Sequence, residues 1–220
     1  MKKTPIVFLM DYEKDQITPN VRPGCEWVVQ GQGVATVKFD GQAALWKDGR
    51  LWKRYDRKLT KQAQSRYNRG LDLGPVNESL FKNPPDGFVP CEPHPDPVSY
   101  HWPGWVPVSA DNPADKWFIE ALATLVDPQE GQTYELVGPS LALNIYGLER
   151  HVLWRHGQEV VDLPDRSFEA IGKFLSERNI EGLVFHHPDG RMAKIRRKDF
   201  KLFWVQEDTR QPPRRRAVSA

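Results

Sequence analysis

The stretch Gly33–Tyr55, GVATVKFDGQAALWKDGRLWKRY, decides the fold and the chemistry of this chain. An apolar strand expected over Val34–Val37 delivers Lys38 into a tight KFDG segment. Two more short strands follow, joined by Asp48-Gly49, a dipeptide typical of hairpin turns. The stretch therefore predicts a lysine held at the end of a strand, with a hairpin directly after it.

Lys38 is placed where a lysine nucleophile is expected. An ammonium group has no lone pair, so a lysine attacks only where burial or nearby cations lower its pKa. We expect Asp40 to hold the amine, and Gly41, which lacks a Cβ, to let a ligand approach the backbone closely. The alternative is that K-x-D-G is an ordinary turn, and the motif alone does not decide between the two.

Composition predicts a packed globular domain. The chain has 220 residues, of which 39% are hydrophobic, and it contains eight Trp and ten Phe. This length suffices for a core of its own and favours one domain, with or without an extension. The formal net charge is only +2, so any affinity for a polyanion must come from the distribution of charge.

The N-terminal sequence predicts a cytoplasmic protein with no role at a membrane. The apolar run IVFLM, between MKK and DYEKD, is too short for a secretory signal, and no run has transmembrane length. Cys25 and Cys91 lack the spacing of a metal site or a disulfide framework, and we interpret both as bystanders.

A cluster of cations follows the hairpin, from Lys53 to Lys58. It is either a solvated face or an anion site, and its position just after the lysine strand favours the anion site. Thr60 then predicts the start of a short helix that ends before Gly70.

Residues 74–110 contain nine prolines between Pro75 and Pro107. This density argues against long helices and central strands, so we expect a long ordered loop or a lid. Regular structure should resume with a helix capped by Asn112 and ended by Asp127.

Further strands carry charged or aromatic candidates. Residues 132–138 read as a strand that holds Glu135, and the simple alternative is a surface carboxylate on an edge strand. Tyr146 and Trp154 follow, the latter in a strand expected to return to Val161 through a turn at His156-Gly157. Aromatic residues of this kind are more often core than base-stacking groups.

The C-terminal part predicts a helix and a hairpin. Apolar residues at helical spacing indicate a helix over Ser167–Arg178. A strand with Glu181 at its start then leads through a turn at 188–190 into Arg191–Arg197. On a strand, Lys194 and Arg196 share one face, so the two cations can converge on one ligand.

These four charged features, taken in order, resemble motifs of the covalent nucleotidyltransferases, which include ATP-dependent DNA and RNA ligases and messenger-RNA capping enzymes. VKFDG is similar to their motif I, TYELVG to motif III, IEGLVF to motif IV and MAKIRR to motif V. LWKRYDRKLTKQAQ and KIRRKDFKLFW bring the chain nearest to the single-domain, human-type 5′-3′ RNA ligases. The resemblance covers about residues 33–205.

The resemblance implies an α+β nucleotidyltransferase (ligase adenylation) fold, with two antiparallel sheets flanked by helices and the nucleotide site between them. It implies an adenylation domain over 1–206, followed by a basic, disordered tail over 207–220. DNA ligases and capping enzymes usually append an OB-fold of roughly a hundred residues after motif V, and this chain has no room for one.

The resemblance also implies a role for each motif residue. Lys38 would attack the α-phosphate of ATP, expel pyrophosphate and carry AMP. Lys194 and Arg196 would bind that phosphate. Asp40 and Gly41 would border the nucleotide.

Four more positions take implied roles. Arg54 would contact the nucleotide or the incoming 5′-phosphate, and Glu135 would accept a hydrogen bond from the ribose. Tyr146 is the candidate for stacking on adenine. Glu181 would hold Mg²⁺ or Mn²⁺ directly or through water.

The implied function is ATP-dependent joining of RNA ends that carry a 5′-phosphate and a 3′-hydroxyl, with no obligate protein partner. Two alternatives remain open. One is a noncatalytic nucleic-acid-binding protein on a ligase-like scaffold. The other is an adenylyltransferase or capping-type enzyme with another acceptor.

Overall fold

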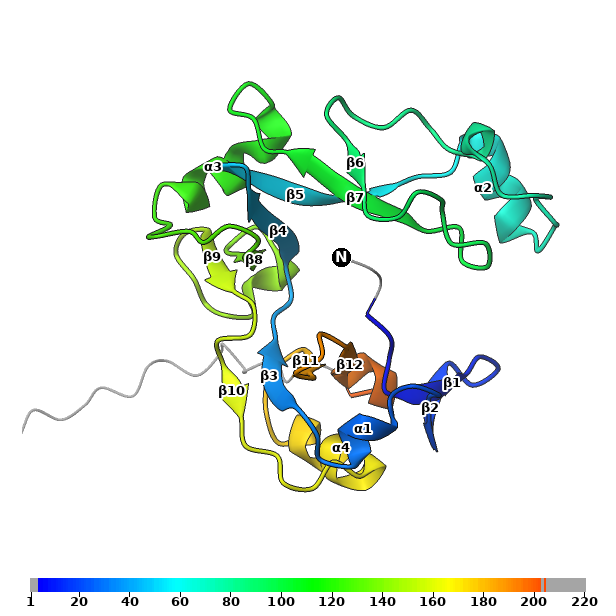
Figure 1. Cartoon of the computed structure of the whole chain (residues 1–220), viewed down its shortest axis with the longest axis vertical. Coiled ribbons are helices and arrows are strands. Elements are labelled where there is room, and N and C mark those ends of the chain that lie inside the picture. Colours follow the sequence, from blue (N-terminus) through cyan, green and yellow to red (C-terminus); the bar gives the residue numbers. More distant parts are fainter. Residues whose placement is uncertain (1–3, 203, 205–220) are drawn as a thin grey trace, which may run out of the picture. The chain divides into compact units, whose positions relative to one another are not determined.

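The computed structural model describes residues 4–202 and 204 and divides the chain into two compact units (Figure 1). Within the described ranges, the first unit comprises residues 4–5 and 38–160, and the second comprises residues 6–37, 161–202 and 204. Strands dominate and helices are short, so the expected α+β class is confirmed. The predicted tail, 207–220, lies outside the described residues.

The first unit is built on a six-stranded sheet of order β6-β7-β5-β4-β8-β9, in which every neighbouring pair is antiparallel. The predicted hairpin joins β4 to β5, and positive φ values at Asp48 (51°) and Gly49 (68°) give the turn the twist that hairpins need. The strands are β4 (Gln42–Lys47), β5 (Arg50–Arg57), β6 (Val89–Pro90), β7 (Trp102–Pro107), β8 (Thr133–Val137) and β9 (Val152–Arg155).

β7 corrects the expectation that residues 74–110 hold no inner strand. It pairs with β5 along its whole length although it contains Pro103 and Pro107. The carbonyl of Pro103 accepts a hydrogen bond from Cys91 N (2.9 Å), so the nitrogens of both prolines face the β6 side of the strand. Because neither nitrogen faces β5, the missing N–H groups cost the ladder with β5 nothing, and the other neighbour, β6, is only two residues long.

The first unit's helices begin where capping residues predict. The Thr60 side chain accepts from Ala63 N at the start of α2 (Lys61–Asn68), and Gly70 follows its end with φ of 69°. Asn112 caps a 3₁₀ turn, η2 (Pro113–Asp115), that leads into α3 (Lys116–Leu122). Two further 3₁₀ turns are η1 (Glu78–Leu80) and η3 (Ala142–Asn144).

Two apolar clusters stabilise this unit. One packs α3 against the sheet, and its buried members are Ala44, Leu51, Phe118, Ala121, Tyr134 and Leu136. The other lies under α2, and its buried members are Leu59, Ala63, Leu73, Phe81 and Trp102. The proline-rich segment therefore supplies core residues to the second cluster, which agrees with an ordered loop rather than a linker.

The second unit contains a four-stranded sheet of order β10-β3-β11-β12 and a separate hairpin of β1 and β2. β10 joins this sheet beside β3, so the predicted return strand to Val161 does not form a hairpin with β9. The elements are β1 (Phe8–Asp11), β2 (Gln16–Val21), α1 (Glu26–Val29), β3 (Val34–Lys38), β10 (Val160–Val161), α4 (Phe168–Ser176), β11 (Gly182–His186), β12 (Met192–Arg196) and η4 (Arg197–Phe200).

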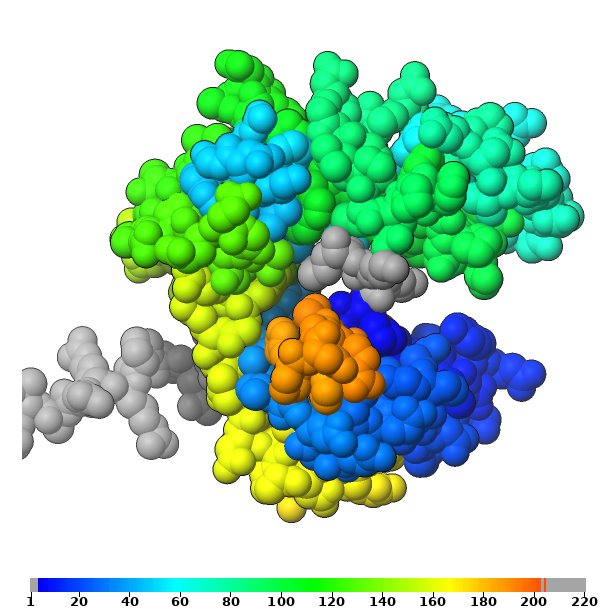
Figure 2. All heavy atoms as spheres, in the orientation of Figure 1, coloured from blue at the N-terminus to red at the C-terminus, as the bar shows by residue number. Residues whose placement is uncertain are grey.

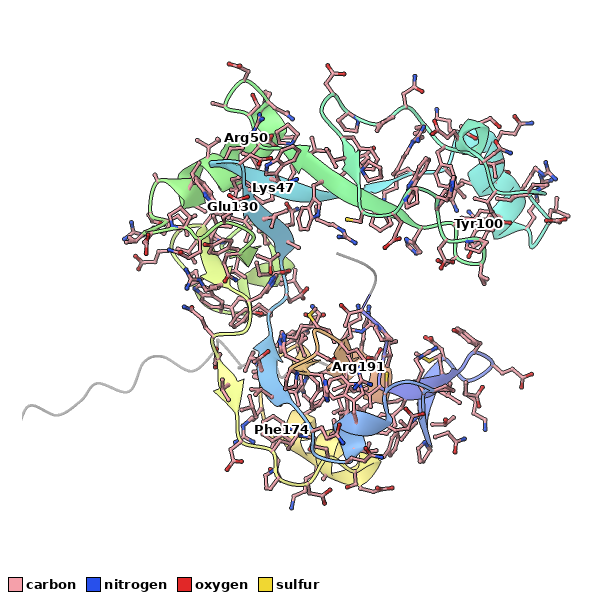
Figure 3. All side chains as sticks on the ribbon, viewed as in Figure 1. Lys47, Arg50, Tyr100, Glu130, Phe174 and Arg191 are labelled. Atoms are coloured by element: carbon pink, nitrogen blue, oxygen red, sulfur yellow. The ribbon has the colours of Figure 1, made fainter. Side chains whose placement is uncertain are left out.

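α4 supplies the helical side of the second unit's core. Ser167 caps it, its side chain accepting from Ala170 N (3.2 Å), and the predicted apolar stripe is confirmed. Ile171 and Leu175 are fully buried with Phe185 and Ile195 of the β11–β12 hairpin. Phe174, labelled in Figure 3, belongs to the same core.

A buried ion pair ties the first unit's sheet to α3. The Asp115 side chain is fully buried, accepts from Lys53 Nζ on β5 and from Ser109 N (3.0 Å), and has no access to water. Replacing one partner leaves the other charge buried and uncompensated.

We therefore expect Asp115→Ala to lower the free energy of unfolding by about 3–5 kcal/mol, measured by urea denaturation. Glu177→Ala is the matched control, because it removes the exposed Lys173–Glu177 pair (3.9 Å) and should cost at most about 0.5 kcal/mol. Equal losses in the two variants would contradict the structural role of Asp115.

Candidate active site

Lys38 closes β3, as the sequence predicts, and is half-buried. Its Nζ donates to the carbonyl oxygen of Phe39 (3.0 Å). This contact bends the amine back over the residue that follows it in the KFDG segment. The amine therefore lies at a strand end, partly shielded from water, which is the setting expected of a nucleophilic lysine.

An aromatic cluster surrounds the KFDG segment. The buried Phe39 ring lies edge-on to Trp154 (4.9 Å between centroids), and Tyr146 lies edge-on to Trp154 (4.8 Å). The Tyr146 hydroxyl accepts from the backbone N–H of Asp40 (2.6 Å). Tyr146 thus holds the segment in place, and its predicted stacking on adenine stays a prediction.

A cavity of about 370 Å³ opens beside this cluster. Its aromatic walls are Phe39 and Trp154, and Arg155, Gln158 and Glu159 complete the lining. Sequence reasoning favoured a core role for Trp154, and the structure places this residue in the wall of the cavity, a position that suits contact with a planar ligand.

Gly41 is required by the chain's own backbone. A Cβ at this position would lie 2.1 Å from the carbonyl oxygen of Leu136 on β8. The structure therefore supplies a reason for this glycine other than the predicted approach of a ligand: β4 could not pair with β8 here if residue 41 had a side chain.

Glu135 lies on an inner strand, so the edge-strand alternative is wrong. It is 7% exposed and pairs across the sheet with Ala43 on β4 and Trp154 on β9. One carboxylate oxygen hydrogen-bonds His156 Nε2 (2.9 Å), and His156 Nδ1 contacts Thr133 Oγ1 (3.0 Å). Sequence reasoning missed this role of His156, because a single histidine in a turn carries no periodic signal.

The structure thus brings four predicted positions together in the first unit, directly after Lys38 in space. These positions are Asp40, Gly41, Glu135 and Tyr146. Motif I and motif III meet because β4 pairs with β8. The hydrogen bond from Asp40 N to the Tyr146 hydroxyl adds a second connection between these parts of the chain.

Arg54 lines a different cavity, of about 750 Å³. Its guanidinium lies over the ring of Trp105 (5.4 Å) and donates to Cys91 Sγ (3.4 Å). Asp56 and His101, joined by a 2.6 Å contact, line the same cavity. Cys91 is therefore a contact of a predicted site residue, whereas Cys25 is buried in the second unit's core, and burial raises the pKa of its thiol.

The motif V cations share one face of β12, as predicted. Half-buried Lys194 and Arg196 alternate with Ala193 and Ile195, which are fully buried. Arg196 is also oriented by Asp199, whose Oδ1 accepts from Nη2 (2.7 Å) and Nε (3.1 Å). This partner lies three residues along the chain, where η4 turns back on the strand end.

Arg197, the next basic residue, has a structural role. It is buried, its Nη1 donates to the carbonyls of Leu175 and Arg178, and burial lowers the pKa of its guanidinium. Its backbone N–H donates to the carbonyl of Glu181 (2.8 Å). Glu181 is half-buried and lies directly before β11, so the β11–β12 pairing holds it at a fixed position.

The described residues contain neither a cluster of metal-binding side chains nor a membrane-spanning helix. In residues 4–202 and 204, no group of three or more His, Cys, Asp or Glu side chains could hold a metal ion. Within the same ranges, no helix combines the length and the apolar character needed to cross a membrane.

Comparison with known proteins identifies the family. Residues 114–219 match the family model described as RNA ligase 1. Proteins named RNA ligase 1 are similar to this chain: that of Mus musculus is 30% identical over an alignment of 227 positions, covering 80% of this chain and 69% of the relative. That of Danio rerio is 29% identical over 273 positions, covering 94% of this chain and 83% of the relative.

The chain therefore belongs to an RNA ligase family. More narrowly, it is a member of the RNA ligase 1 family, whose Pongo abelii member is 29% identical over 80% of this chain. The resemblance stated from the four motifs is confirmed at this level.

The close approach at Gly41 yields a test that separates folding from binding. We expect Gly41→Ala to lower the free energy of unfolding by about 1–3 kcal/mol or more in urea denaturation, because the new Cβ meets a backbone carbonyl that has no room to move.

Gly172→Ala on α4 is the control, since the nearest atom to its new Cβ is in the Phe200 side chain (3.0 Å), which can shift. If Gly41→Ala keeps wild-type stability and loses only nucleotide binding, the ligand role predicted for Gly41 replaces the structural one.

Proposed function

We propose that this chain is an ATP-dependent RNA ligase that works through a covalent lysine-AMP intermediate on Lys38. The observation that carries the proposal is the half-buried Lys38 at the end of β3, in a chain that belongs to an RNA ligase family. We also propose that both units belong to one nucleotidyltransferase domain over 1–206, and that the protein acts in the cytoplasm without an obligate protein partner.

In the first step, the neutral amine of Lys38 attacks the α-phosphate of ATP. A phosphorus–nitrogen bond forms, the bond to the bridging oxygen breaks, and pyrophosphate leaves. Lys194 and Arg196 bind the oxygens of the same phosphate and stabilise the charge that develops there. Two observations support this step. Lys194 and Arg196 share one face of β12, and Asp199 orients Arg196.

The nucleoside part of ATP is proposed to occupy the surroundings of the KFDG segment. The cavity lined by Phe39 and Trp154 supports an adenine site there, with Tyr146 as the predicted stacking residue. Glu135 accepts a hydrogen bond from a ribose hydroxyl through an oxygen of its carboxylate, while His156 fixes the orientation of that carboxylate. Asp40 and Gly41 border the same nucleotide.

In the later steps, AMP passes from Lys38 to an RNA 5′-phosphate, and the 3′-hydroxyl of another end displaces it. Arg54 is proposed to contact the nucleotide or the incoming 5′-phosphate through the donors of its guanidinium. In each step the side chains align an in-line attack and stabilise phosphoryl oxygens.

Glu181 is the proposed ligand of Mg²⁺ or Mn²⁺. Its half-buried carboxylate offers the oxygen donors that these hard cations prefer, and Mg²⁺ usually takes its other ligands from water and substrate phosphates. When bound, the metal ion would neutralise phosphate charge. Glu181 would hold it from its place just before β11, where the backbone carbonyl of Glu181 accepts a hydrogen bond from Arg197 N.

Incubation with α-labelled ATP and Mg²⁺, followed by denaturing electrophoresis, tests the mechanism. We expect label on the wild-type chain and on Lys47→Ala, an exposed control lysine on β4, and none on Lys38→Ala. A noncatalytic binder gives no label on any of them. Label on the Lys38→Ala variant would contradict the role of Lys38 as the nucleophile.

The choice of acceptor is tested with the same enzyme after it has been labelled with AMP. We expect label to pass to a 5′-phosphorylated RNA end and to be released on joining to a 3′-hydroxyl. If charged enzyme transfers AMP only to another acceptor, the adenylyltransferase alternative replaces the ligase.

Glu181→Gln tests the metal role with little change in shape. We expect charging to fall by about 10²-fold or more, while the melting temperature stays near that of the wild type. Charging at the wild-type rate and with the wild-type dependence on Mg²⁺ would remove Glu181 from this role.

A further inference from the structure

A groove lined by cations lies on the first unit, outside the residues assigned to the reaction. It has a volume of about 580 Å³ and is formed by α2 and the two short segments that flank it. Four of its lining residues are Lys58, Lys61, Arg69 and Lys82, and the described residues that line it include no Asp or Glu. All four cations are exposed. The groove therefore concentrates positive charge on one side of α2.

The backbone holds two of these lysines side by side. Leu59 and Phe81 form an isolated antiparallel bridge, and Lys82 N donates to the carbonyl of Lys58 (2.9 Å). The buried Arg57 guanidinium stacks over Trp102 (4.5 Å), and its Nε donates to the carbonyl of Lys82 (2.8 Å). The paired lysines thus stand on an ordered base and not on a loose loop.

α2 presents the other two cations. Its buried side is Ala63, which packs into the apolar cluster beneath the helix, so the stripe Lys61, Gln64, Asn68 and Arg69 faces out at helical spacing. Gln64 Nε2 donates to Asn68 Oδ1 (2.8 Å). Figure 2 shows the cyan atoms of α2 on the surface, and Tyr100, labelled in Figure 3, lies edge-on to Tyr67 of the helix (5.6 Å).

The positions of Lys58 and Lys61, at the start of α2, are unfavourable for the stability of the helix. The first turn of an α-helix carries a partial positive charge, which favours acidic residues, yet the first turn of α2 contains none and begins with Lys61. Lys58 lies just before the same end. An anionic ligand would offset this unfavourable charge at the start of α2.

We propose that this groove binds the phosphodiester backbone of the RNA substrate, away from the ends that react. The identity of the ligand rests on the proposed RNA ligase function. Four cations spaced along a groove suit successive phosphates better than a single one, and the neutral amides of Gln64 and Asn68 can hydrogen-bond phosphate or 2′-hydroxyl oxygens. Such contacts bind without regard to sequence.

The test compares two double variants with the same change in net charge. Lys58→Ala/Lys82→Ala removes the paired lysines of the groove and leaves their backbone hydrogen bonds in place. Lys47→Ala/Lys173→Ala removes two exposed cations elsewhere, one on β4 and one on α4. The affinity of each full-length variant for a fluorescent single-stranded RNA is measured by anisotropy over a series of salt concentrations.

We expect the groove variant to bind RNA about tenfold more weakly at low salt, with the slope of log K against log salt smaller by about 1–2. The control variant should stay within roughly twofold of the wild type. Both variants should accept AMP from labelled ATP at the wild-type rate, and melting temperatures near the wild type verify folding.

Equal losses of RNA affinity in the two variants, or no RNA binding by the wild type, overturn the proposal. Loss of ATP charging with RNA affinity intact also overturns it, because the groove would then hold nucleotide phosphates. If the wild type binds RNA through the groove and never accepts AMP, the proposed RNA-binding role of the groove is supported and the proposed ligase mechanism is wrong.

Discussion

The approach of the Gly41 backbone to the carbonyl of Leu136 is the constraint on which the candidate site depends. It permits β4 to pair with β8 in the register that sets Ala43 opposite Glu135. β8 pairs in turn with β9, which sets Glu135 opposite Trp154. One missing Cβ thus allows a motif near residue 40 and another near residue 135 to meet, although almost a hundred positions separate them in the chain.

Several basic residues in the described part of the chain stabilise the interior of the fold. Arg57 and Arg197 are buried and satisfy backbone carbonyls, and Lys53 neutralises the buried Asp115. Others, such as Lys58 and Lys82, project from ordered backbone into solvent. A run such as KRYDRK mixes both kinds at adjacent positions, because alternate residues of a strand face opposite sides of the sheet.

Local features of the fold could be predicted because their causes are local. The Asp48-Gly49 turn, the caps at Thr60 and Ser167, and the alternation around Lys194 each depend on a few neighbouring residues. β7 could not be predicted, since the tolerance of Pro103 depends on which side of the strand its nitrogen faces once β7 pairs with β5. The partner of β10 also depends on contacts far along the chain.

In the candidate site, too, some residues could be predicted from the sequence and others could not. Motif order identified the charged residues, and the positions of Lys38 and of the Lys194–Arg196 face agree with the prediction. The partners that orient them, His156 for Glu135 and Asp199 for Arg196, carry no pattern that sequence reasoning uses. His156 meets Glu135 only because β9 pairs with β8, whereas Asp199 lies three residues after Arg196, at a position that no motif singles out.

The central claim is that one amine, Lys38 Nζ, carries the nucleotide. Peptide mapping by mass spectrometry after incubation with ATP and Mg²⁺ locates the adduct directly, and adding pyrophosphate tests whether it is an energy-rich intermediate. We expect AMP on the peptide that contains VKFDG, at Lys38, and its removal by pyrophosphate. AMP on a different residue, or an adduct at Lys38 that pyrophosphate does not reverse, would contradict it.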